Sequence, residues 1–301
     1  MDIRPNELSV RKKEAGGGVA AEVSQHPTEN PKHRARSRVV ILLHGYNNSL
    51  EGARKSYDDY LKEMGARWPQ WQWLVRDCFG YFWPGDKNWG PLRFASYSLE
   101  IRPAKESAKV LYNYLLDLAG PNGTEVQLFL VAHSLGNRVL LELLMEFPGQ
   151  TPSRVRLSGV CLMAAAVPVK MAKPGGKLHD AVHYARTRGR SLNMFSKKDK
   201  VLKWAFPIGE TLAFEGFFPK AIGREGEPPG VWTSRVDMQP NNHSHYWAGK
   251  RTAEVVGEFL AQGIPPEVSP AEIETNEPPE ENEIGAREME KRSLLERRTF
   301  G

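Results

Sequence analysis

The chain has 301 residues, of which 40% are hydrophobic, so it holds enough apolar material for one large domain or two modest ones. Its net charge of +5 is unevenly spread, because ten Glu but only five Lys or Arg lie from residue 264 onward. The positive residues of the remainder are scattered and form no stripe with interleaved aromatics, so we expect no nucleic-acid partner.

Hydropathy and cysteine content narrow the class further. No stretch of 18 apolar residues is present, and the first residues form no apolar run of the signal-peptide kind. We therefore expect a cytoplasmic protein without a transmembrane segment. Cys78 and Cys161 lie far apart in the sequence, which predicts neither a disulfide framework nor a CxxC site.

The two ends of the chain differ in composition from the middle. Residues 1–36 are polar, with a glycine run and a basic end, and predict a disordered basic arm. Residues 263–301 form an acidic tail rich in Pro and Glu, and residues 286–297 within it have the pattern of a short charged helix. This helix either docks on an unknown protein partner or stays solvated. Residues 37–262 are left as one folded domain.

Apolar runs typical of strands alternate with helical patterns through this middle region. Strands are predicted at residues 39–43, 72–79, 126–131, 157–165, 191–196 and 231–238. Helices are predicted at residues 50–65, 101–118, 137–147, 179–186 and 247–261. This alternation indicates an α/β fold, with a mostly parallel central sheet flanked by helices on both faces. Ligands of such sheets bind at the carboxyl ends of the strands.

The first strand of this region ends in His44-Gly45-Tyr46-Asn47-Asn48. A glycine at this point lets the backbone turn, so that the N–H of Tyr46 points at a bound carbonyl oxygen. The N–H of Leu135 would complete an oxyanion hole of the kind that stabilises acyl-transfer transition states. On its own, the same sequence is equally consistent with a plain strand-ending turn.

The sequence Ala132-His133-Ser134-Leu135-Gly136 lies between a strand pattern and a helix pattern. This order is that of a nucleophile elbow, a sharp turn that lifts a serine hydroxyl above the end of a sheet. Ala132 stands where the usual elbow has glycine, and we expect its extra methyl group to be tolerated. His133 is interpreted as a packed residue of the turn.

Two more strand ends supply an acid and a base. Asp199, just after the strand at residues 191–196, is the predicted acid that orients a histidine, with Asp237 in reserve; the alternative for Asp199 is a solvated residue of a charged loop. His243 lies between the last strand and the last helix, where a histidine can act as general base toward Ser134. His245 is the alternative base.

Other patterns are weighed in the same way. His179 and His183 have the spacing of a zinc-binding helix with Asp180 between them, but no third ligand follows, and an ordinary helix face is favoured. We predict no metal and no cofactor. The long connection at residues 203–230 suggests a small lid, and the aromatic residues within 81–89 offer an acyl pocket or simply core packing.

The chain order Ser134, Asp199, His243 is that of α/β-hydrolases. Together with the HGYN sequence at residues 44–47 and the AHSxGN sequence at residues 132–137, residues 38–262 resemble the α/β-hydrolase superfamily, and in particular its poorly characterised bacterial members. The resemblance implies an α/β-hydrolase domain at residues 37–262 and a serine hydrolase, esterase- or lipase-like, that acts on a small-molecule ester. An acyltransferase with the same triad and a non-catalytic binding module remain open as alternatives.

Overall fold

The computed structural model describes residues 5–13, 18–26, 37–46, 48–85, 93–118, 123–147, 154–212, 219–226, 228 and 230–262. The chain divides into two compact units, Met1–Gly263 and Ile264–Gly301. All of the second unit lies outside the described residues, and so does the predicted acidic tail with its short helix.

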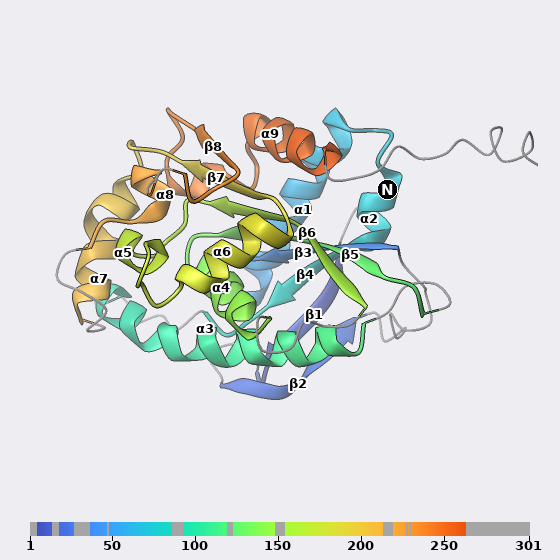
Figure 1. Ribbon diagram of the computed structural model, residues 1–301, viewed down its shortest axis with the longest axis horizontal. Helices are drawn as coiled ribbons and strands as arrows, with labels where there is room; N and C mark the ends of the chain where they lie inside the picture. Colours follow the sequence, from blue (N-terminus) through green and yellow to red (C-terminus); the bar gives the residue numbers. More distant parts are fainter. Residues whose placement is uncertain are drawn as a thin grey trace, which may run out of the picture. The chain divides into compact units, whose positions relative to one another are not determined.

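The described residues form one sheet of eight strands in the order β2-β1-β4-β3-β5-β6-β7-β8 (Figure 1). Neighbouring strands are parallel, except that β2 at the edge is antiparallel to β1. The strands are β1 (Asn6–Arg11), β2 (Val19–His26), β3 (Arg38–Leu43), β4 (Cys78–Phe82), β5 (Val126–His133), β6 (Val155–Met163), β7 (Ser191–Phe195) and β8 (Ser234–Asp237). The predicted α/β fold with a mostly parallel central sheet is therefore confirmed.

Helices cover both faces of this sheet. In Figure 1 the helices α3, α4 and α6 lie in front of the sheet, α1 lies behind it, and α9, which packs against α1, lies at the top. The helical elements are α1 (Leu50–Arg67), α2 (Gln72–Asp77), α3 (Arg93–Leu116), α4 (Gly136–Glu146), α5 (Val169–Ala172), α6 (His179–Arg188), η4 (Val201–Ala205), α7 (Phe206–Leu212), α8 (Ile222–Glu225), η5 (His243–His245) and α9 (Lys250–Ala261). No helix of the described residues is long and apolar enough to cross a membrane.

The central strands are buried from end to end because helices pack on both sides of them. In β4 all five residues are buried, and in β5 only one of the eight positions is not fully buried. Continuous apolar strands of this kind are typical of a parallel sheet between two helical layers. Gly80 in β4 marks how closely α1 approaches, because a Cβ there would lie 2.6 Å from the ring of Tyr57.

The prediction of a disordered arm is wrong for the part of it that the structure describes. Strands β1 and β2 form a hairpin, and β1 joins the sheet in parallel with β4. Leu8 and Val10 alternate with polar residues and are fully buried, and this short alternation supplies the apolar side of an edge strand. Arg54 of α1 binds the carboxylate of Glu7, with Nε–Oε1 at 2.6 Å. Residues 27–36 of the predicted arm lie outside the described residues.

The predicted strand at residues 72–79 is also wrong in position. The structure has the short helix α2 at Gln72–Asp77, and the strand β4 occupies Cys78–Phe82. A short apolar run fits either a strand or a buried helical turn, and the burial of the five residues that follow decides where the strand lies. Helix α3 begins at Arg93, before the predicted start at residue 101. Cys78 and Cys161 are buried and are not joined to each other.

The described residues of the predicted lid region include η4 from Lys203 onward, α7 and α8. Residues 213–218, 227 and 229 of this connection lie outside the described residues, and so do residues 86–89 of the predicted acyl pocket. Both the lid and the pocket stay predictions.

Candidate active site

The turn at Ser134 joins β5 to α4 and has the strained backbone of a nucleophile elbow. Ser134 has a φ of 54°, a left-handed conformation that costs a non-glycine residue about 1 kcal/mol or more. Backbone hydrogen bonds hold it there, since the N–H of Ser134 donates to Met163 O at 3.0 Å and the N–H of Ala166 donates to Ser134 O at 3.1 Å. The buried amide of Asn137 donates to the same two carbonyl oxygens, at 3.0 and 3.1 Å.

Two glycines let the end of β3 come against this turn. A Cβ on Gly136 would lie 2.4 Å from His44 O and 2.5 Å from Leu43 O. A Cβ on Gly45 would lie 2.7 Å from the Cβ of Ser134. The elbow forms with the fully buried Ala132 at its first position, so the extra methyl group is accommodated.

Asp199 follows β7 and is fully buried, unlike the lysines beside it. Its Oδ1 accepts a hydrogen bond from the N–H of Leu202 at 2.9 Å, at the start of η4. Its Oδ2 lies 2.7 Å from Nδ1 of His243. The alternative of a solvated loop residue does not hold for this aspartate.

His243 lies between Asp199 and Ser134 and contacts both. Its Nε2 is 2.9 Å from Oγ of Ser134, while its Nδ1 faces the carboxylate. A carboxylate only accepts, so Nδ1 carries the proton and Nε2 is left to accept the serine hydroxyl. The three residues form one hydrogen-bonded chain, and this tautomer is the one that a general base needs.

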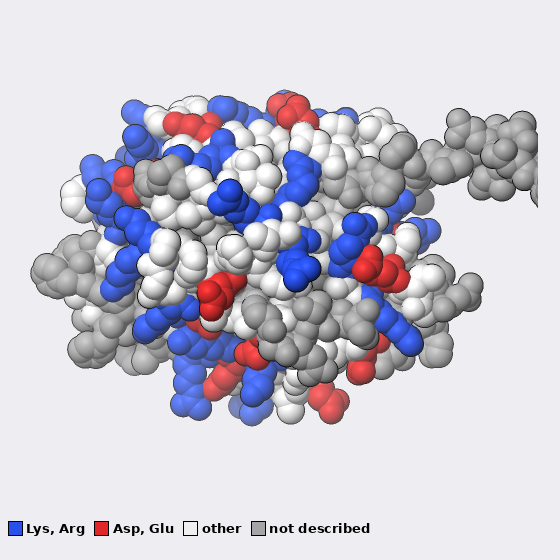
Figure 2. All heavy atoms as spheres, in the orientation of Figure 1, with Lys and Arg blue, Asp and Glu red and all other residues white. Residues whose placement is uncertain are grey.

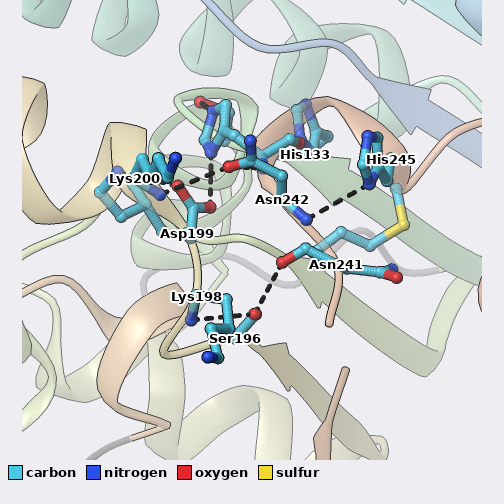
Figure 3. Close-up of polar contacts among 12 residues, drawn as sticks. His133, Ser196, Lys198, Asp199, Lys200, Asn241, Asn242 and His245 are labelled. Atoms are coloured by element: carbon cyan, nitrogen blue, oxygen red, sulfur yellow. Dashed lines mark hydrogen bonds and ion pairs between the residues drawn. The ribbon is translucent and has the colours of Figure 1, made fainter. Parts of the chain in front are cut away.

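The reserve residues lie elsewhere. His245 is exposed, and its Nδ1 accepts from the N–H of Asn242 at 3.4 Å (Figure 3). The carboxylate of Asp237 accepts from the backbone and side-chain nitrogens of Gln239, at 3.0 and 2.9 Å. Of the predicted alternatives, the structure brings only His243 and Asp199 to the serine.

The loops that carry the acid and the base are joined to each other. Oγ of Ser196 donates to Asn241 O at 2.7 Å, and the N–H of Lys200 donates to Oδ1 of Asn242 at 3.4 Å (Figure 3). The same amide oxygen caps η5 by accepting from the N–H of His243 at 3.0 Å. These bonds fix the distance between the two loops, and so they fix the contact between Asp199 and His243.

His133 has a larger part in the site than its sequence position predicts. Its ring is buried, with Nε2 2.8 Å from the carbonyl oxygen of His243. Burial is the main cause that lowers the pKa of His133 to about 3, and the neighbouring His243 lowers it further. The ring is therefore neutral, and because a carbonyl only accepts, Nε2 carries its proton and donates. Its place beside the nucleophile is the only signal in the sequence.

The backbone ahead of Tyr46 is held by aromatic side chains. The hydroxyl of Tyr57 accepts from the N–H of His44 at 2.7 Å and donates to Tyr81 O at 2.9 Å. The indole N–H of Trp83 donates to His44 O at 2.9 Å, and its ring stacks on that of His44. The sequence predicts only an acyl pocket or core packing for Tyr81 and Trp83, because nothing in it shows which strand end they reach.

The two predicted oxyanion donors lie on either side of the elbow. Tyr46 follows Gly45, which contacts Ser134, and Leu135 is the first residue before α4. The start of an α-helix presents N–H groups without helical partners and a positive dipole end, which suits a developing negative charge.

The structure gives no support for a metal site within the described residues, where no three His, Cys, Asp or Glu side chains lie close enough together to hold an ion. The rings of His179 and His183 have their centroids 6.2 Å apart on α6, and Nδ1 of His179 lies 3.4 Å from Ala172 O.

The sheet and the serine elbow define the class of the protein as an α/β hydrolase. Residues 20–212 match the model of the family described as "Alpha/beta hydrolase of unknown function (DUF900)", and the chain belongs to this family. No curated protein sequence matches the chain.

Solved structures of hydrolases are similar in fold at low sequence identity. A candidate hydrolase from Agrobacterium vitis is 12% identical over 77% of this chain and 91% of its own, with a TM-score of 0.43. The esterase of the archaeon Pyrobaculum calidifontis is 13% identical over 76% and 77%, with a TM-score of 0.39. EstE5, solved after soaking with p-nitrophenyl butyrate, is 12% identical over 75% and 77%, with a TM-score of 0.41.

Proposed function

We propose that this protein is a serine hydrolase that cleaves carboxylic esters or thioesters through a covalent acyl-enzyme on Ser134. One observation carries the proposal: Oγ of Ser134, the imidazole of His243 and the carboxylate of Asp199 are joined by hydrogen bonds of 2.9 and 2.7 Å. A binding module that had merely kept the fold would not need these two hydrogen bonds or this tautomer of His243.

Each group has a role that follows from its position. Oγ of Ser134 attacks the ester carbonyl while its proton passes to Nε2 of His243, and Asp199 stabilises the imidazolium that forms. The N–H groups of Tyr46 and Leu135 hold the oxyanion of the tetrahedral intermediate. The C–O or C–S bond then breaks, and His243 returns the proton to the leaving alcohol or thiol. Water, deprotonated by the same histidine, releases the acid and restores Ser134.

Hydrolysis of p-nitrophenyl esters of increasing acyl length tests this proposal. We expect turnover that falls by about 10⁵-fold or more in Ser134→Ala and similarly in His243→Ala, because triad members act as a unit. His245→Ala is the matched control. It is expected to retain activity within about twofold, because it removes an exposed histidine that is not part of the triad. No turnover of any ester by the folded protein, or full activity in Ser134→Ala, would contradict the proposal. Added alcohols or amines reveal acyl transfer by the products that form.

A further inference from the structure

The helical run that follows Asp199 has an apolar face toward solvent. Elements η4 and α7 bury Leu202 and Phe206 against the protein, with 1% and 2% of their surfaces exposed. On the outer side Val201, Trp204 and Ile208 are 42%, 65% and 42% exposed, and they are the exposed large hydrophobic residues of the described parts of the chain. Exposed apolar groups that recur along one helix mark a surface for binding, since scattered single residues are the rule elsewhere.

Four lysines accompany this apolar face. Lys197, Lys198, Lys200 and Lys203 are all exposed. Among the residues that the structure describes, their ammonium groups have no carboxylate partner, and Nζ of Lys203 lies 4.8 Å from the ring centroid of Trp204. The acidic residue among them, Asp199, is turned inward to His243. Residues 197–208 therefore present uncompensated positive charge beside apolar side chains, and are called the basic apolar segment below.

The surroundings of the segment are also basic. Figure 2 shows Lys and Arg side chains along the edge of the domain where Figure 1 places α5, α7 and α8, with few Asp or Glu among them. Lys220, two residues before α8, is exposed, and α8 packs against η4. A partner that complements this surface therefore needs an apolar layer for the exposed side chains and negative charge beside that layer for the lysines.

An anionic lipid bilayer has both. Tryptophan prefers the level of the lipid headgroups, apolar side chains enter the acyl boundary, and lysines keep their charge near anionic phosphates. We propose that the basic apolar segment docks on the surface of an anionic lipid bilayer, with Val201, Trp204 and Ile208 inserted and the lysines at the headgroups. This binding mode lies on the surface and needs no membrane-spanning helix.

The docking surface is connected to the candidate active site through Asp199, in addition to the bond from the N–H of Lys200 to Asn242. Oδ1 of Asp199 binds the N–H of Leu202 within η4, and Oδ2 binds His243. Docking goes beyond the proposed ester hydrolysis and does not rest on it, because the surface is made of side chains outside the triad.

Flotation of the full chain with vesicles tests the docking. We expect the protein to float with phosphatidylcholine vesicles that contain phosphatidylserine, and not with phosphatidylcholine alone. The variant Lys200→Glu/Lys203→Glu is expected to lower the partition coefficient about tenfold or more. Trp204→Ser is expected to lower the partition coefficient by a similar factor. The side chain of Trp204 is exposed, so we expect this variant to fold normally. Lys62→Glu/Lys109→Glu reverses two exposed lysines of α1 and α3 and is the matched charge control.

The outcomes separate docking from catalysis. Ser134→Ala floats like the unmodified chain if docking is as proposed, whether or not the protein hydrolyses esters. The proposal is overturned if the folded protein ignores anionic vesicles, if it binds neutral and anionic vesicles alike, or if the control variant weakens binding as much as the variants of the segment. Binding of an acidic protein in place of vesicles likewise overturns it.

Discussion

The elbow around Ser134 and the basic apolar segment place their side chains in opposite ways. Around the elbow, Ser134, Asn137 and His133 are polar and buried, and hydrogen bonds to named carbonyl oxygens hold them. In the segment, Trp204 and Val201 are apolar and exposed. A region whose task depends on interatomic distance is tied inward, whereas a region that contacts a partner keeps its apolar surface free.

Asp199 lies at the border between these two regions, and its replacement is expected to have a larger effect than any other change compared below. Asp199→Asn keeps an oxygen for Leu202 N but allows His243 to adopt the wrong tautomer, so kcat for ester hydrolysis falls about 10⁴-fold. Asp237→Asn removes an exposed carboxylate that is not part of the triad, and it should change kcat by less than about twofold. Steady-state kinetics of the two variants measures these changes. Equal losses of kcat in both variants would contradict the assignment of Asp199 as the acid of the triad.

The close approach at the elbow is tested by stability. Gly136→Ala sets a methyl group against the backbone oxygens of Leu43 and His44, so we expect a loss of about 3 kcal/mol in the free energy of unfolding. Gly65→Ala, in an exposed helical position with no atom near the new Cβ, should instead gain about 0.5–1 kcal/mol. Urea denaturation compares the two; a neutral effect at Gly136 would show that the contact with β3 is looser than described.

The two sides of the basic apolar segment differ in the same test. Leu202→Ala removes a buried side chain and is expected to cost about 3 kcal/mol of unfolding free energy. Trp204→Ala removes an exposed ring and should change stability by less than about 0.5 kcal/mol, although it weakens vesicle binding. A large loss of stability in Trp204→Ala would mean that the ring serves the fold and not a partner.

The buried His133 of the elbow should make the stability of the protein depend on pH. Its pKa is lowered to about 3 in the folded protein, so the unfolded chain, with a pKa near 6.5, binds the proton more readily. Stability is therefore lost as the pH falls from about 6.5 toward 3, with about 2 kcal/mol lost between pH 7 and pH 5. His133→Gln should remove this component, whereas His183→Gln, an exposed control on α6, should keep it. Denaturation curves at each pH provide the measurement.

The residues that the sequence singles out and that the structure brings together are those with a local signature. The elbow has a fixed order of strand, serine and helix, and Asp199 and His243 follow strands whose parallel packing brings them to one edge of the sheet. The role of His133 is not predictable in this way, because its partner is a backbone oxygen 110 positions further along the chain. Tyr57 and Trp83 are missed for the same reason.

The fold shows a similar division. Strands β3, β5, β6 and β7 are long or apolar enough to predict, whereas β1 has only Leu8 and Val10 to bury and looks like a polar arm. The edge of the sheet stabilises it, and that edge is a tertiary feature. The apolar face of the basic apolar segment is not predictable from the sequence either. Leu202 and Trp204 are both apolar, and only the structure shows that the first is buried and the second exposed.

The most direct test of the proposed activity is to locate the residue that reacts with a fluorophosphonate probe by mass spectrometry of the intact protein and its peptides. We expect a single adduct on the peptide that contains Ser134, none in Ser134→Ala and strongly slowed labelling in His243→Ala. An adduct on another residue, or labelling of Ser134 that is equally fast without His243, would contradict the proposed activity.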